Sequence, residues 1–318
     1  MEFREFTAGK NDDGRRLDRI LQKIMPETSS SGIYSAIRKK LIRINGSSCR
    51  GNQIVSDGDV IKIAAFLISE HNSSQENYTD YKPSIDCVFM NEHILIINKE
   101  SGISVQPGGK GKSLWEEVIQ FYGEKLESHS ISFKPGPLHR LDRFTSGLVA
   151  FSLSLEGAKW FTEAMQAHSI KKDYLGIVRG CLEDKETWTD CMEESEKDKN
   201  GFHRVKISQS GEKAVTEAIP LSISDTKPLT LVQFKIHTGK KHQIRCQSAF
   251  HGFPLYGDSA YNPNEAQTGQ KFFLHAFRLS FPKDNPVSLP EHIEAPLPQD
   301  FEKFLSLNLI NWDRQIIL

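Results

Sequence analysis

The chain has 318 residues, a formal net charge of −1, 38% hydrophobic residues and 25% charged residues. This composition is typical of a globular protein and leaves room for two domains. No apolar run approaches the roughly 20 residues that cross a bilayer, and charge begins at Glu2, so we expect neither a membrane span nor a secretory signal.

Cysteine usage indicates a reducing compartment. The five cysteines are widely spaced and odd in number, which argues against a disulfide framework and against a CxxC metal site. We therefore expect the cytoplasm.

The charge is unevenly distributed along the chain. Residues 15–63 contain ten basic and four acidic side chains, a net charge of +6, whereas residues 182–200 carry −5. A basic module on a neutral chain is typical of RNA or DNA binding. On charge alone, a solvated charged face is the alternative.

The first module contains two short helices and a small β unit. Residues 17–24 place apolar side chains at helical spacing before Pro26, which predicts a first helix. Serines at 29–31 can cap a second helix, with Ile33, Tyr34, Ile37 and Leu41 on one face and cations on another. Turn signals at Asn45-Gly46 and Asp57-Gly58 then accompany the strand-like segments "LIRIN" and "VIKI".

This order, with the wording "RRLDRIL", "IRKKLIRING" and "IVSDGDVIKI", resembles the alpha-L RNA-binding domain over residues 15–63. The resemblance implies that a basic face contacts the RNA backbone. Its residues are Arg38, Lys39, Lys40 and Arg43.

A polar segment without periodicity, residues 64–84, is expected to be a linker. A second module follows over residues 85–307, with a tail at 308–318. Its predicted strands are 87–90, 94–98, 147–151, 172–180 and 229–239, and its predicted helices are 113–123, 156–168 and 240–252. Strands and helices alternate irregularly, so we expect an α+β fold with a central, largely antiparallel sheet. The stretch "EESEKDKNG" is predicted to be a solvent loop between strands.

Three distant segments carry polar residues beside apolar strands: "HRLDRFTSG", "KKDYLGIVRG" and "HTGKKHQIRCQ". His237 and His242 have no carboxylate nearby in sequence for a metal site. The glycine-rich "PGGKGK" lacks the spacing of a phosphate loop, and no serine or cysteine has an evident base. What remains is a lone carboxylate, Asp142, with basic and aromatic partners, either a structural ion pair or a reactive group.

These motifs resemble those of the RluA-type pseudouridine synthases. "HRLDRFTSGLVAF" resembles the family signature, "KKDYLGIVRG" its K-x-Y strand, and "TGKKHQIR" with "GFPLYGDSAY" its later motifs. "FFLHAFRLSF" and "APLP" fit the C-terminal pattern, so the resemblance extends over residues 85–307. An alpha-L domain before the catalytic domain is common in this family.

The resemblance implies a role for each of four residues. Asp142 would be the nucleophile toward a uridine, and Arg245 would pair with it and keep the carboxylate ionised. Tyr174 would stack on the uracil, and Arg140 would fill the gap left by a uridine that leaves the helix stack. Taken singly, Asp142 with Arg245 is also compatible with a structural salt bridge, and Tyr174 with a core aromatic residue.

The resemblance implies an RNA uridine isomerase that needs no cofactor and no metal, acts as a monomer, and modifies RNA, with large-subunit ribosomal RNA favoured. A non-catalytic RNA-binding ribosome assembly factor is the alternative, and a hydrolase using Asp142 as base is a third. The sequence leaves open whether Asp142 attacks the ribose anomeric carbon or uracil carbon 6.

The chain departs from the family pattern at two places. The early motif runs "KESGISVQ", with Glu100 where proline is usual and Gln106 where histidine is usual, so RNA contacts near Lys99 are expected to differ. Lys240 and Lys241 replace the usual Arg-Thr, which keeps positive charge but changes any bidentate phosphate contact.

Overall fold

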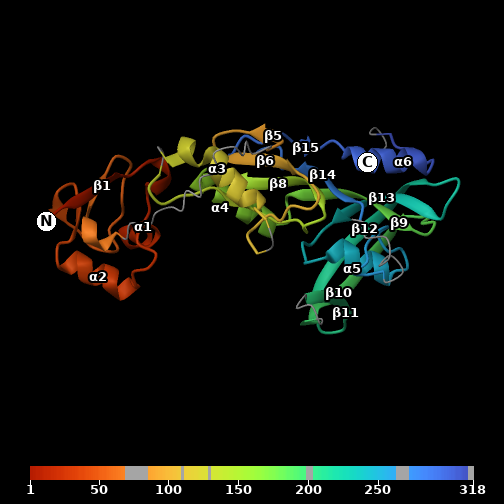
Figure 1. Cartoon of the computed structure of the whole chain (residues 1–318), viewed down its shortest axis with the longest axis horizontal. Helices are drawn as coiled ribbons and strands as arrows, with labels where there is room; N and C mark the ends of the chain where they lie inside the picture. The colour runs from red at the N-terminus through yellow and green to blue at the C-terminus, as the bar shows by residue number, and fades with distance from the viewer. Residues whose placement is uncertain (69–84, 109–110, 128–129, 198–202, 263–271, 314–318) are drawn as a thin grey trace.

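The computed structural model describes residues 1–68, 85–108, 111–127, 130–197, 203–262 and 272–313. Most of the expected linker, residues 69–84, lies outside them. Figure 1 shows a small N-terminal unit at one end of the molecule and a larger unit built on one long twisted sheet. Among the described residues, no helix is long and apolar enough to cross a membrane.

The N-terminal unit is an antiparallel four-stranded sheet packed against two helices. The strand order is β1–β4–β2–β3, and the core comes from all of these elements except the short β3. The bounds are β1 Phe3–Thr7, α1 Leu17–Ile24, α2 Ser30–Arg38, β2 Ile42–Ile44, β3 Ser47–Ser48 and β4 Val60–Ala64, with short 3-10 turns η1 Lys10–Asp12 and η2 Ala65–Leu67. The sequence did not predict β1, which pairs with β4 along its whole length.

The ends of α2 show how the sequence encodes this unit. The Ser29 hydroxyl caps the helix by accepting from the Gly32 N–H at 3.2 Å, as expected. The helix stops before Lys40, whose φ of +58° is left-handed. The prediction that Tyr34 lies on the apolar face is wrong: it is exposed, and its hydroxyl donates to Asp18 at 2.6 Å because a phenol gains from a charged acceptor.

The large sheet has eleven strands in the order β11–β10–β12–β13–β9–β14–β8–β6–β5, with β15 beside β14 and β7 beside β8. Only the pair β8–β14 is parallel among the described strands, which confirms the expected α+β class. The bounds are β5 Cys87–Met90, β6 Ile94–Lys99, β7 Gly136–Pro137, β8 Ser146–Ser152, β9 Lys171–Arg179, β10 Glu186–Lys197, β11 His203–Ser208, β12 Glu212–Ile223, β13 Leu229–Ile236, β14 Leu274–Ser280 and β15 His292–Glu294.

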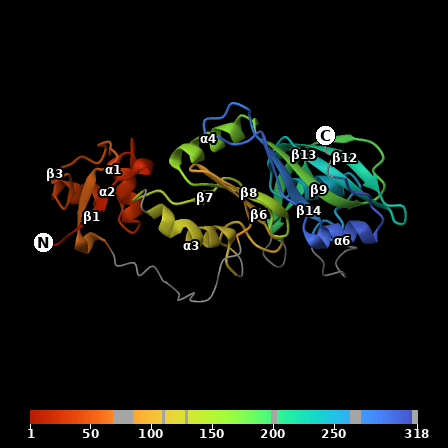
Figure 2. The ribbon, with the colours of Figure 1, turned by 90° about the horizontal axis from the view of Figure 1, so that it is seen from above.

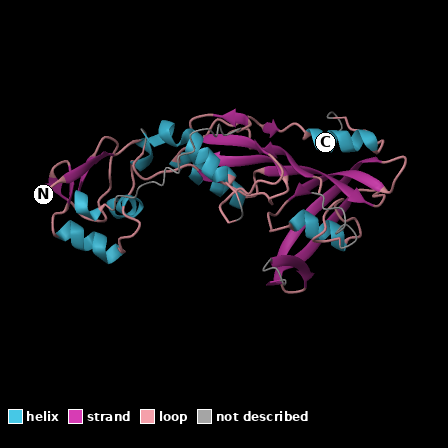
Figure 3. Cartoon of the chain, viewed as in Figure 1, coloured by secondary structure: helices cyan, strands magenta, loops and turns pink. Residues whose placement is uncertain are grey.

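Helices cover both faces of this sheet (Figures 2 and 3). On one face α3 (Leu114–Glu127) and α5 (Gln243–Phe250) contribute to a single core with strands β6, β8, β9, β13 and β14. On the other face α4 (Leu155–Gln166) covers β6 and β8, and α6 (Gln299–Leu307) covers β9 and β13. The expected tail contributes Ile310, buried against α6.

The prediction of a solvent loop at 193–201 is wrong for its first part. Strand β10 continues to Lys197 and pairs with β11 in a long hairpin (Figure 1). Glu193 lies opposite Lys206, with an ion pair of 3.1 Å, and Met192 and Val205 are buried at the base. Cross-strand charge pairing and one apolar face suit a strand despite the acidic composition. Residues 198–201 lie outside the described structure.

The parallel pair β8–β14 depends on a glycine. Gly147 has a φ of +106°, and a Cβ built there would lie 2.3 Å from the Ala276 carbonyl oxygen. Only glycine allows this backbone approach. The approach joins the two halves of the sheet beside the loop that carries Asp142.

We expect Gly147→Ala to lower the free energy of unfolding by about 3 kcal/mol, because it adds a clash with backbone to an unfavourable φ. Gly252→Ala is the matched control, since Gly252 also has a positive φ, +89°, but open space around its Cβ position. It should cost only about 1 kcal/mol. Urea denaturation of both variants measures the difference, and equal losses would refute the role of the close approach.

Candidate active site

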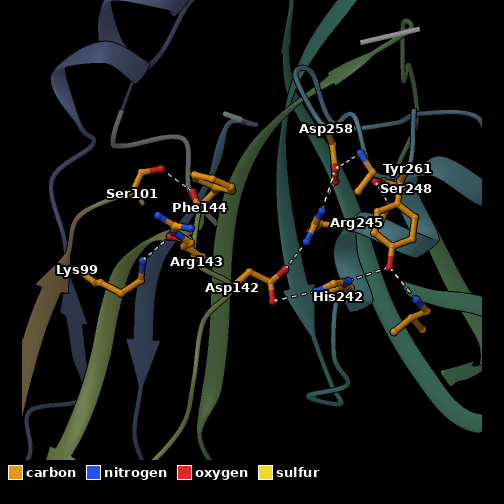
Figure 4. A network of polar contacts seen from close by, with 12 residues as sticks. Lys99, Ser101, Asp142, Arg143, Phe144, His242, Arg245, Ser248, Asp258 and Tyr261 are labelled. Carbon is orange, nitrogen blue, oxygen red and sulfur yellow. Dashed lines mark hydrogen bonds and ion pairs between the residues drawn. The ribbon is translucent and has the colours of Figure 1, made fainter. Parts of the chain in front are cut away.

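Asp142 lies in the loop that joins β7 to β8, and a buried lysine holds this loop. Lys99, only 1% exposed, donates from Nζ to the carbonyls of Glu100, Ile103 and Arg143 at 2.8, 2.9 and 3.1 Å. Lys99 therefore ties the loop to the segment after β6 (Figure 4). The Lys99 side chain itself is buried, and the expectation that RNA contacts near it differ from the family pattern stays a prediction.

Further bonds fix the same loop. Arg143 donates from Nε to the Gly102 carbonyl at 2.8 Å, and Ser101 donates to the Phe144 carbonyl at 2.9 Å. On the other side His139 accepts from the Ala150 N–H at 3.1 Å and stacks on Phe161. Burial lowers the pKa of His139 to about 3, so its ring stays neutral and serves as an acceptor. The loop is thus held by backbone contacts on both sides of Asp142.

One guanidinium connects Asp142 to a second carboxylate. Arg245, on α5, donates from Nη1 to Asp142 Oδ2 at 3.0 Å, and from Nε and Nη2 to both oxygens of Asp258 at 2.7 and 2.9 Å. The pKa of Arg245 is raised by these two carboxylates despite the opposing effect of burial. The predicted pairing of Asp142 with Arg245 is present, but Arg245 is shared and Asp258 takes its bidentate side.

His242 is a second neighbour of Asp142 that the sequence did not single out. Its Nε2 lies 3.7 Å from Asp142 Oδ1, and its Nδ1 lies 2.9 Å from the Tyr261 hydroxyl. That hydroxyl also accepts from the Val205 N–H at 3.0 Å, so Tyr261 connects the His242 ring to β11. Burial lowers the pKa of His242, against the pull of Asp142. A neutral His242 thus faces the carboxylate (Figure 4).

Aromatic rings enclose Arg245. Its guanidinium carbon lies 4.5 Å from the centroid of Phe272 and 5.1 Å from that of Tyr261. Rings at this distance attract the cation and exclude water from it. The ion pair with Asp142 is therefore weakly screened on the protein side, while the Asp142 side chain itself is 20% exposed.

Asp142 opens into a cavity of about 580 Å³, which is within the range of pockets that take small organic ligands. Its lining includes Gln106 and Phe144 from two loops, Arg204 from the β10–β11 hairpin, and Arg140 and Arg143 beside Asp142. Arg140 is exposed and also lines a smaller cavity of about 70 Å³ that shares Asp142 with the larger one. The larger cavity is thus open to solvent and carries several arginine side chains on its lining.

Tyr174 lines the smaller cavity and is 8% exposed. It lies on β9 between Phe234 of β13 and Ala276 of β14. Burial and the Asp142 charge raise the pKa of Tyr174, so its phenol is protonated at neutral pH and can donate but not act as a base. Tyr174 is thus both a buried aromatic residue of the core and a neighbour of Asp142 at the cavity.

The two substituted lysines are engaged within the protein. Lys240 pairs with Glu212 and Lys241 with Glu194, each at 2.8 Å. Glu194 lies on β10 within the acidic stretch, whereas Glu212 is the first residue of β12. Exposed pairs of this kind contribute little to stability.

The basic residues of the N-terminal unit lie far along the chain from this site, close to one another in sequence. Arg38, Lys39, Lys40 and Arg43 are all exposed, at the end of α2 and on β2. Arg43 donates to the Lys40 carbonyl and lies 5.3 Å from the Phe3 ring centroid. This arrangement leaves their charges facing solvent. Among the described residues, no cluster of histidine, cysteine or carboxylate side chains is placed to hold a metal ion.

Comparison with known proteins identifies the family. The sequence pattern of the family described as RNA pseudouridylate synthase matches residues 93–250, and that of the S4 domain matches residues 15–61. This chain belongs to the RNA pseudouridylate synthase family. The matches confirm the expected RluA-type resemblance and the N-terminal RNA-binding module, and they support an isomerase rather than a binding-only assembly factor.

Curated relatives extend over nearly the whole chain. Ribosomal large subunit pseudouridine synthase D of Nitrosomonas europaea is 27% identical over 317 residues, covering 95% of this chain and 86% of that one. Ribosomal large subunit pseudouridine synthase C of Yersinia pestis is 29% identical, covering 92% and 91%. Among solved structures, human RNA Pseudouridylate Synthase Domain Containing 1 shares the fold, with a TM-score of 0.56, 21% identity, and coverage of 73% of this chain and 92% of that one.

The synthase fold brings together Asp142, Arg245, Tyr174 and Arg140, as the sequence predicted. It leaves the basic set of the S4 domain on a separate surface. His242, Asp258 and Tyr261 were missed as site residues, although each lies in a motif of the sequence, "HQIR" or "GDSAY". The charge of Asp258 and its presence in a motif were the available signals, and only the fold reveals its partner.

Asp258→Asn should lower kcat by roughly tenfold to a hundredfold, since a slightly misplaced Arg245 costs orientation at Asp142. KM for RNA should change little, because Asp258 is 2% exposed and lies behind Arg245. Steady-state kinetics separate the two constants.

Glu294→Gln is the control, because it neutralises another carboxylate bound to an arginine, Arg278, at 2.6 Å and away from both cavities. It should leave kcat unchanged. A fall in stability with normal kcat in Asp258→Asn would show that Asp258 holds only the fold.

Proposed function

We propose that this synthase converts a uridine of large-subunit ribosomal RNA to pseudouridine, with Asp142 as the nucleophile. The observation that carries this proposal is the Asp142 carboxylate, bound by Arg245 at 3.0 Å and open to a cavity of about 580 Å³. The relatives named as large-subunit synthases C and D support the choice of RNA.

The reaction rearranges bonds within one nucleotide. The bond from uracil N1 to the ribose breaks, the base rotates, and carbon 5 forms the new bond to the same ribose carbon. The hydrogen on carbon 5 leaves as a proton and N1, freed from the ribose, takes up a proton, so the product is an isomer of the substrate and atoms and charge balance. The Asp142 carboxylate can serve in this scheme by adding to the anomeric carbon or to uracil carbon 6, and it leaves again when the new bond is complete.

The other predicted residues have roles consistent with their positions. A base can reach Asp142 only after leaving the RNA stack, and Arg140, which is exposed and lines the cavity, would occupy the vacated space. Tyr174 presents a ring beside Asp142 for contact with the base and carries a phenol proton that can be donated. Arg245 orients the carboxylate and balances its charge.

The exposed cations of the S4 domain supply affinity for the RNA backbone. Arg38, Lys39, Lys40 and Arg43 can each approach phosphates without disrupting a fold contact of the core. The enzyme acts in the cytoplasm as a monomer in this proposal. All five cysteines are free, which agrees with a reducing compartment.

Asp142→Asn should abolish release of tritium from RNA labelled at uracil carbon 5, since the amide keeps the shape of the side chain but not its nucleophilic charge. RNA affinity and thermal stability should stay near those of the parent enzyme. Asp190→Asn serves as the control: this carboxylate also binds neighbours, including His251 at 3.0 Å, but lines neither cavity. Normal turnover by Asp142→Asn would contradict the proposed nucleophile.

Replacing Arg38, Lys39, Lys40 and Arg43 together by alanine should weaken RNA binding and flatten its salt dependence. The slope of log K against log salt should fall by about 0.7–0.9 for each phosphate that the protein no longer neutralises. The control removes four exposed lysines of the catalytic unit, Lys134, Lys213, Lys283 and Lys303, which changes the net charge equally. Equal effects of the two sets would indicate general electrostatics instead of a defined surface.

A further inference from the structure

A fully buried carboxylate of the N-terminal unit is bound mainly by the catalytic unit. Asp12, at the end of η1, is 0% exposed. It accepts from the Ser130 hydroxyl at 2.9 Å, the Ile131 N–H at 2.7 Å, and the N–H and hydroxyl of Ser132 at 3.2 and 2.5 Å. The Gly9 N–H, 3.1 Å away, is the one donor from its own unit. Four of these five bonds therefore cross between the units.

Neighbouring contacts strengthen this junction. Arg15 donates from Nη1 to the Ser132 hydroxyl at 2.6 Å, and the Leu155 N–H at the start of α4 donates to Asn11 at 3.0 Å. Ile131 packs against the core of the N-terminal unit. The segment 130–132 thus inserts both polar and apolar groups into the other unit.

The junction is narrow. Beside it lies a cavity of about 840 Å³ lined by both units, with Asn11 and Asp13 on one side and His93 and Glu156 on the other. The units are therefore not joined there by a continuous apolar interface. Charge-assisted hydrogen bonds are directional, so a small contact built on them can fix an angle that a flexible linker would leave free.

The segment 130–132, which binds Asp12, is closely connected to the β7–β8 loop that carries Asp142. Ser132 lies ten residues before Asp142, and Trp115 of α3 donates to the Pro135 carbonyl between them at 2.8 Å. At the same end of α3, the backbone N–H groups of Leu114 and Trp115 donate to the carbonyls of Ser104 and Val105, two residues that line the cavity at Asp142. A rotation of the N-terminal unit would therefore strain the hydrogen bonds by which α3 holds residues 104, 105 and 135 around the active site.

We propose that Asp12 fixes the S4 domain in one orientation and so makes it a specificity-determining element that sets the separation between the bound RNA backbone and the target uridine. In Figure 1 the N-terminal unit and the β10–β11 hairpin lie toward opposite ends of the molecule and extend to the same side. An RNA held by Arg38 and its neighbours can then present only uridines at a fixed offset to Asp142. The expected effect on RNA modification rests on the proposed function. The expected effect on the distance between the two units does not.

The structural test measures the distance between the two units. Spin labels at cysteines introduced at exposed Ser47 and Gln209, with Cys87, Cys181 and Cys191 changed to serine, report that distance in the full chain. The parent should give one narrow distribution. Asp12→Ala should broaden it, and so should Ser130→Ala with Ser132→Ala, which attacks the same contact from the catalytic unit. Asp13→Ala is the matched control, because Asp13 is exposed and bonds to Asp57 within its own unit.

The functional test compares two substrates from the same ribosomal RNA region. On a long RNA that reaches both units, kcat/KM of the Asp12 variant should fall by roughly tenfold. On a short stem-loop that reaches only the catalytic unit, it should be unchanged. The salt slope of binding should also stay constant, since no cation is removed.

Two results would overturn the inference: a broad distance distribution in the parent, or a broad distribution in both junction variants with normal turnover of long RNA. If the parent fails to modify ribosomal RNA at all, the proposed substrate is wrong, while the distance measurement still decides whether Asp12 docks the domain.

Discussion

The arrangement of the active site depends on one guanidinium placed between two carboxylates. Arg245 is bound on its bidentate side by Asp258 and presents its remaining nitrogen to Asp142. A cation held by a single partner could rotate with that partner, but one anchored by a buried second carboxylate is a fixed reference point. Asp142 is therefore positioned by a group whose own place is set by the protein interior.

The positions of Arg245 and Asp142 relative to each other are set by two separate parts of the fold. Arg245 and Asp258 belong to α5 and the turn after it, whereas Asp142 belongs to the loop before β8. The two sides meet because β8 runs beside β14 at Gly147, where the backbones approach too closely for any side chain. A contact between backbones thus sets the distance across which the ion pair forms.

Much of this could be predicted from sequence. Segments such as α1, with helical periodicity, and β8, a continuous apolar run, are predictable because local pattern and tertiary environment agree. The Asp142–Arg245 pair follows from motif resemblance, since no local pattern indicates a contact across 103 residues. The hairpin at β10–β11 was missed in part because its stability comes from cross-strand pairs such as Glu193 with Lys206, and a single strand considered alone looks like a polar loop.

The remaining failures share a physical cause. Asp258 and His242 lie in motifs of the sequence, but their partners in the site lie far along the chain or in another motif, and no local pattern indicates those contacts. Asp12 is similar: in sequence it is one of two adjacent aspartates, Asp12 and Asp13, and only the fold shows that one is buried under donors while the other faces solvent. Charge pattern alone cannot distinguish such neighbours.

The hydrogen bonds of Lys99 limit how the β7–β8 loop and the segment after β6 can change during evolution. The three acceptors that hold its ammonium group against the loop are main-chain carbonyls, which every residue type supplies, proline included. Position 100 can therefore carry glutamate where relatives of this type usually carry proline, with the same oxygen offered to the lysine. The lysine itself lacks that freedom, because no other side chain ends in a single atom that carries three donors, and the five donors of arginine are spread over a planar fork. Sequence drift should accumulate at the acceptor positions while the donor stays the same.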